Sequence, residues 1–106
     1  MSSGPVTELF GVSFISVQNE IETGRGWGYD VVVVAHDDAP ERRIRVTLSW
    51  ADYEYWSHGS RAPAEIVRRL VEYLFAQNGF TPPDRFDAAT ARRWFPSIDE
   101  HLSEYG

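Results

Sequence analysis

The hydrophobic period of this chain changes once, and that change limits the possible folds more than any other feature. Apolar residues mostly recur at every second position before Ser57, and they recur at helical spacing after Pro63. The first pattern is typical of β-strands and the second of amphipathic helices. We therefore predict an α+β fold, with an N-terminal three-stranded antiparallel β-meander packed against C-terminal helices. At this length, residues 1–106 are expected to form a single domain.

Three segments carry strand patterns. In residues 6–21 the apolar parity switches near Phe14–Ile15, which predicts a bulge in the first strand. The run Val31–Val34 is apolar on both faces, as expected for a central, well-packed strand. In the third strand, residues 42–50, apolar residues alternate with polar ones up to Trp50, which we expect in the core.

Short connections set the pairing of these strands. Gly24–Gly26 is a turn signal, and Gly28 is expected to extend the flexible stretch. A second turn is expected at residues 37–40. Neither connection is long enough for a parallel crossover, so the pairing should be antiparallel. The first strand should lie at an edge, where it could pair with a second copy of the chain.

The helical half begins at Pro63, which suits the first turn of a helix. Gly79 is the expected left-handed residue after this helix. A short helix should follow Asp87, and a capping-box pattern that begins at Ser97 predicts a final helix. The apolar stripe of the first of these helices comprises Ile66, Val67, Leu70, Val71 and Leu74.

Composition excludes several classes of function. The chain has no cysteine and no lysine, so thiolate metal sites, disulfides and lysine Schiff bases are ruled out. A net charge of -6 disfavours non-specific binding to nucleic acid or anionic lipid. Residues 1–5 lack the pattern of an export signal, and no apolar run is long enough to span a bilayer. We expect a cytoplasmic protein that does not enter a membrane.

The segment Trp50–Arg61, called here the aromatic segment, is the strongest candidate for a site. Four of its twelve residues are Trp or Tyr, and it joins the sheet to the first long helix. Trp, Tyr and Arg are enriched in binding hot spots. We predict a small interaction or accessory domain that binds a protein partner or a second copy of itself. The predicted binding residues are Tyr53, Glu54, Tyr55, Trp56, His58 and Arg61.

A small enzyme or ligand-binding domain is the alternative function. If the third strand continues, Asp52 and Glu54 share a face and could act as an acid–base pair, with His58 as a proton carrier and Arg61 nearby. Two carboxylates alone do not define a reaction, and Ser57–Ser60 does not match a nucleophile elbow. We therefore assign no catalytic residue.

Two further classes have less support. A nucleic-acid binder would need Arg43 and Arg45 to be joined by other arginines on one face, and the acidic balance opposes it. The three histidines, His36, His58 and His101, have no pair at the spacing of a helical zinc site. We predict neither a metal nor a cofactor.

Overall fold

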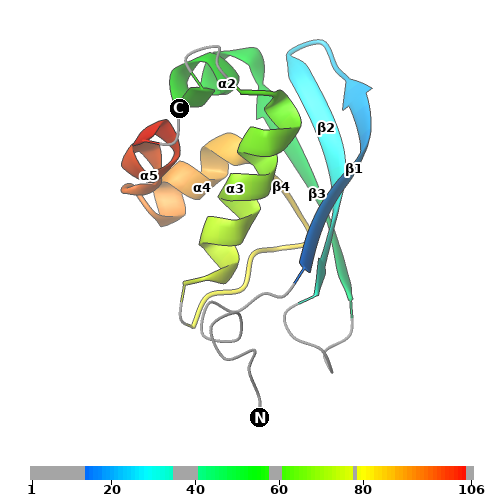
Figure 1. Ribbon diagram of the computed structural model, residues 1–106, viewed down its shortest axis with the longest axis vertical. Helices are drawn as coiled ribbons and strands as arrows, with labels where there is room; N and C mark the ends of the chain where they lie inside the picture. Colours follow the sequence, from blue (N-terminus) through cyan, green and yellow to red (C-terminus); the bar gives the residue numbers. More distant parts are fainter. Residues whose placement is uncertain (1–13, 35–40, 58–60, 78, 105–106) are drawn as a thin grey trace.

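The fold is a sheet covered by helices on one face, as a computed structural model shows for residues 14–34, 41–57, 61–77 and 79–104 (Figure 1). The predicted α+β class and the N-terminal meander are confirmed. In the described residues the sheet has four strands in the order β1-β2-β3-β4. The elements are β1 (Phe14–Glu22), β2 (Gly26–Val34), β3 (Arg42–Ser49), α2 (Trp50–Ser57), α3 (Pro63–Phe75), β4 (Arg85–Asp87), α4 (Ala88–Trp94) and α5 (Ile98–Glu104). No described helix has the length and apolar character needed to cross a membrane.

Strands β1, β2 and β3 pair antiparallel, as predicted. The irregularity in β1 lies between Gln18 and Ile21 rather than at Phe14–Ile15, so that prediction was wrong in position. Asn19 occupies the left-handed region with φ 55°. Asparagine tolerates this conformation better than most residues, which explains why the strand bends there.

The β1–β2 turn is tight, and Gly26 is already part of β2. A Cβ on Gly26 would lie 2.0 Å from the carbonyl oxygen of Leu48, so only glycine fits. Thr23 fixes the turn, because its hydroxyl accepts hydrogen bonds from the backbone N–H groups of Arg25 and Gly26. Gly28 also lies inside β2 and is buried, which corrects the expectation of a longer flexible stretch.

Strand β4 was not predicted. Its three residues pair parallel with β3, and the N–H of Arg45 donates to the carbonyl of Asp84 at 2.8 Å. The parallel direction is possible because the chain crosses over through α2 and α3 before it returns to the sheet. A strand of three residues is too short to leave a period in the sequence.

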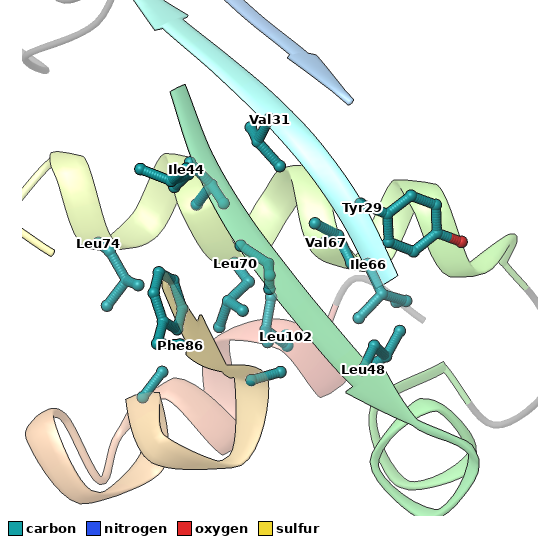
Figure 2. Close-up of a cluster of buried hydrophobic side chains, with 14 of the residues drawn as sticks. Tyr29, Val31, Ile44, Leu48, Ile66, Val67, Leu70, Leu74, Phe86 and Leu102 are labelled. Carbon is teal, nitrogen blue, oxygen red and sulfur yellow. The ribbon is translucent and has the colours of Figure 1, made fainter. Parts of the chain in front are cut away.

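The core lies between the sheet and the helices. Val31 and Val33 of β2 face it, whereas Val32 points to the opposite face and is nevertheless buried. The predicted stripe of α3 is fully buried and belongs to one hydrophobic cluster with Ile44 and Val46 of β3. Figure 2 shows part of this cluster. Closing one face of a sheet with an amphipathic helix is the expected way to bury both apolar surfaces.

The ends of the C-terminal helices agree in part with expectation. Asp87 caps α4, since its Oδ2 accepts from the N–H of Ala89 at 3.0 Å. Gly79 is left-handed, with φ 80°, as expected. The helix before it ends at Phe75, however, so Gly79 is not the residue that directly follows the helix cap.

Candidate functional site

The first part of the aromatic segment is a helix, which corrects the expectation that the third strand continues. Helix α2 begins at Trp50, directly after β3. The Ser49 hydroxyl accepts from the N–H of Asp52 at 3.1 Å, and this bond satisfies one free donor at the helix start. The change of period therefore lies at Ser49, not at Ser57–Pro63.

One face of α2 is fixed to the rest of the domain. Trp56 is completely buried, and its indole N–H donates to Asp99 of α5 at 2.8 Å. The Tyr53 hydroxyl donates to the backbone carbonyl of Arg61, and the Tyr53 ring packs edge-on against Trp27 of β2. Helix α2 is thus held by β2, by α5 and by the chain that leads into α3.

Arg92 of α4 ties this face of α2 to α5. Its guanidinium contacts Asp52 at 3.2 Å and Asp99 at 2.8 Å, and it lies over the rings of Trp56 and Tyr55. Partial burial opposes the charged form of Arg92, but hydrogen bonds and charge from Asp99 and Asp52 outweigh burial and raise its pKa. The charged arginine therefore pairs with two carboxylates that are partly removed from water and balances one of their two charges.

The opposite face of α2 is open. We call Trp50, Ala51, Glu54 and Tyr55 the α2 outer face; all four are exposed and lie at positions i, i+1, i+4 and i+5 of the helix. Trp50 is 50% exposed and Tyr55 is 54% exposed. The expectation that Trp50 lies in the core was wrong, because the helix turns it away from the apolar face of β3.

Two hollows adjoin α2. A groove of about 630 Å³ runs between the β1–β2 turn, the ends of β3 and β4, and the starts of α2 and α4. A shallower hollow of about 330 Å³ is formed by Asp52, Tyr55, Arg92 and Asp99. Asp52 lines both hollows, so the two adjoin at this residue.

The two carboxylates of the alternative catalytic site do not share one face of α2. Because the segment is helical, Asp52 and Glu54 project to different sides of α2. Asp52 faces Arg92, whereas Glu54 is exposed to solvent. Arg61 contributes its backbone carbonyl to the Tyr53 contact, and His58 lies outside the described residues.

The arginines are spread over several faces. Arg43 and Arg45 lie on the uncovered face of the sheet, as expected, and Arg85 of β4 is the register partner of Arg45. Arg45 pairs with Asp30 at 2.7 Å and Arg43 pairs with Glu41 at 3.0 Å. A hydrogen bond from Asn19 lowers the pKa of Asp30 most, and a hydrogen bond from Arg45 lowers it further. The arginines of α3 form helical ion pairs, Arg69 with Glu65 and Arg68 with Glu72.

Sequence reasoning missed Arg92 and Asp99, which reach α2 from helices about 40 residues further along the chain. No local spacing connects these helices to the aromatic segment. In the described part of the chain, no three His, Asp or Glu residues lie together as metal ligands would. Comparison with known proteins found no family model, no curated protein and no solved structure that matches this chain.

Proposed function

We propose that this chain is a protein-interaction domain whose α2 outer face binds a positively charged segment of a partner protein. One observation carries the proposal: Trp50 and Tyr55 are half exposed on a helix whose other face is fixed by buried contacts. Exposed aromatic side chains on a rigid element are typical of binding hot spots. A partner that covers them removes a large apolar area from water.

The chemistry of the α2 outer face selects the kind of partner. Glu54 lies one helical turn after Trp50 and next to Tyr55, and it is exposed. Ala51, which is small and exposed, lies between Trp50 and Tyr55 on the helix surface. An arginine or lysine there could stack on a ring and pair with the Glu54 carboxylate.

The residues around the α2 outer face also favour a positively charged partner. Asp52 and Asp99 line the adjoining hollow, where Arg92 balances only one of their two charges. Glu100 is exposed on the neighbouring helix α5. The whole chain carries a net charge of -6, which accelerates the approach of a basic partner and repels an acidic one.

The fixed inner face of α2 also favours binding. Affinity is lost when a surface must become ordered on binding, and α2 is already ordered by Trp56 and by the Arg92 contacts. The enzyme alternative has less support, because its acid–base pair would need two carboxylates near one reacting atom. Asp52 and Glu54 lie on different sides of α2.

The test is selection of random peptides displayed on phage against the immobilised protein. We expect peptides rich in arginine or lysine to be enriched, and we expect Trp50→Ala or Tyr55→Ala to weaken their binding about tenfold or more. Glu54→Arg should reverse the charge preference. Ile21→Ala is the matched control, because Ile21 is an equally exposed apolar residue on the sheet.

The proposal fails under two outcomes. Enrichment of acidic or purely apolar peptides would contradict the assigned partner chemistry. Basic peptides that bind all three α2 variants as well as the unchanged protein would place the site elsewhere. Circular dichroism of each variant confirms that the fold is intact before binding is compared.

A further inference from the structure

Strand β1 lies at the edge of the sheet. It pairs with β2 on one side, and no backbone partner lies on its other side among the described residues. An open edge presents unpaired N–H and C=O groups that can accept another strand. Charges usually protect such edges, but the stretch Phe14–Gln18 carries none. We call Phe14–Gln18 the β1 edge segment.

We propose that the β1 edge segment pairs antiparallel with the same segment of a second copy, about a twofold axis that passes through Ser16. The sheet would then continue across both copies. In this register Ser16 lies opposite its own counterpart, Ile15 lies opposite Val17 of the second copy, and Phe14 lies opposite Gln18. A twofold axis makes every such contact occur twice, which is the commonest symmetry of protein dimers.

The pattern of side chains selects this register. Ile15 and Val17 are half buried at the border of the core, so placing each opposite the other extends the core across the axis. Phe14, which is 54% exposed on the uncovered face, would cover the aliphatic part of Gln18. An axis through Val17 would instead place Phe14 opposite Glu20, an apolar ring against a carboxylate.

The end of the segment is also defined. Asn19, with φ 55°, interrupts the regular strand, and the carboxylates Glu20 and Glu22 lie beyond it. Within the segment no like charges meet across the axis, so no local charge repulsion opposes the pairing. The opposite edge of the sheet differs, because β4 has only three residues and two of them, Arg85 and Asp87, are charged.

The contact is short, so the dimer should be weak. Pairing of one short strand on each side buries less than the roughly 1,200–2,000 Å² typical of tight complexes, and a dissociation constant in the micromolar range is expected. This inference does not depend on the proposed function of α2. If both hold, the dimer presents two α2 outer faces, which would strengthen binding to a partner with repeated basic segments.

Sedimentation equilibrium over a range of concentrations tests whether the dimer forms. Ser16→Lys places two lysines directly opposite each other on the axis and should weaken the dimer about fivefold or more. Gln18→Lys adds the same charge on the same face of the strand, but it faces Phe14 and should leave the dimer largely intact. A protein that stays monomeric at millimolar concentration would overturn the proposal, as would equal weakening by both variants.

Disulfide formation tests the register, because the chain contains no cysteine of its own. Opposed residues of an antiparallel pair have Cβ atoms about 4.5–5.5 Å apart, close to the span of a disulfide. Ser16→Cys should therefore form cross-linked dimers at least about tenfold faster than Gln18→Cys, whose two copies would be about 13 Å apart along the strand. Equal rates for the two variants would exclude the axis through Ser16.

Discussion

Replacing Arg92 by methionine should destabilise the domain through the two carboxylates that it leaves behind. In the native protein Arg92 pairs with Asp52 and Asp99, whose side chains are 13% and 26% exposed. Methionine keeps much of the packing on Trp56 but provides no charge and no hydrogen-bond donor. Two partly buried carboxylates would then face each other without a cation between them.

The magnitude follows from the burial of the three groups. Breaking a fully buried ion pair by removal of one partner costs about 3–5 kcal/mol, whereas an exposed pair contributes about 0–1 kcal/mol. Arg92 is 34% exposed, so the network lies between these limits. We expect a loss of about 2–3 kcal/mol in the free energy of unfolding, which lowers the melting temperature by about 10 °C.

Urea unfolding followed by tryptophan fluorescence provides the measurement. Arg93→Met is the matched control, because Arg93 is an exposed neighbour on the same helix, and it should change stability by less than about 0.5 kcal/mol. The double variant Arg92→Met with Asp52→Asn should be more stable than the sum of the single changes predicts, since one unpaired charge has been removed. A loss below about 1 kcal/mol for Arg92→Met, or additive effects in the double variant, would refute the argument.

Two further predictions concern the sheet. Gly26→Ala should cost about 2–3 kcal/mol or prevent folding, because its Cβ would overlap the backbone of Leu48, whereas Gly24→Ala, with open space around it, should be close to neutral in thermal unfolding. Burial, reinforced by the hydrogen bond to Glu20, raises the pKa of Tyr29 above its ordinary value of 10.0. The neutral Tyr29 side chain therefore contributes stability below pH 10, and this contribution is lost as the pH rises above 10, where the unfolded chain loses the phenol proton first. Urea unfolding between pH 9 and about 11 should show a smaller loss of stability for Tyr29→Phe than for the unchanged protein. An equal loss would contradict the assignment.

The parts of the fold that could be predicted are those whose pattern repeats within one element. Residues 42–49 alternate between apolar and polar over the whole strand, and α3 shows its apolar stripe over thirteen residues. Both patterns are long enough to define a face, so the meander and its helical cover followed from them. The bulge in β1 was misplaced, because a change of parity in the sequence does not show which residue takes the unusual backbone angle.

Helix α2 was missed because the alternation of β3 continues into Trp50 by coincidence. A local signal against a continuing strand was present. Ser49 followed three residues later by Asp52 resembles the start of a helix, and the Ser49 hydroxyl does cap α2. Read as a helix, the segment divides into an inner set with Asp52 and Trp56 and an outer set with Trp50 and Tyr55, which is the division that the structure has.

The contacts of Arg92 and the pairing of β4 could not have been predicted by the same means. Arg92 and Asp52 lie forty residues apart in sequence, and the pairing of β4 with β3 joins residues equally distant. Such contacts depend on how α3 carries the chain back across the sheet. The residues that bear them, an arginine on a short helix and a three-residue strand, show no period of their own.

The aromatic side chains on the two faces of α2 differ in burial and in contacts, and this difference bears on function. Trp56 on the inner face has lost all contact with water, and its indole N–H has a carboxylate partner. Trp50 on the outer face keeps half of its surface in water. Packing within the domain therefore explains why a tryptophan stands at position 56, but it does not explain the exposed tryptophan at position 50. A partner that covers Trp50 and Tyr55 would give the outer face the apolar and polar contacts that the inner face already has, which is why the binding experiments begin there.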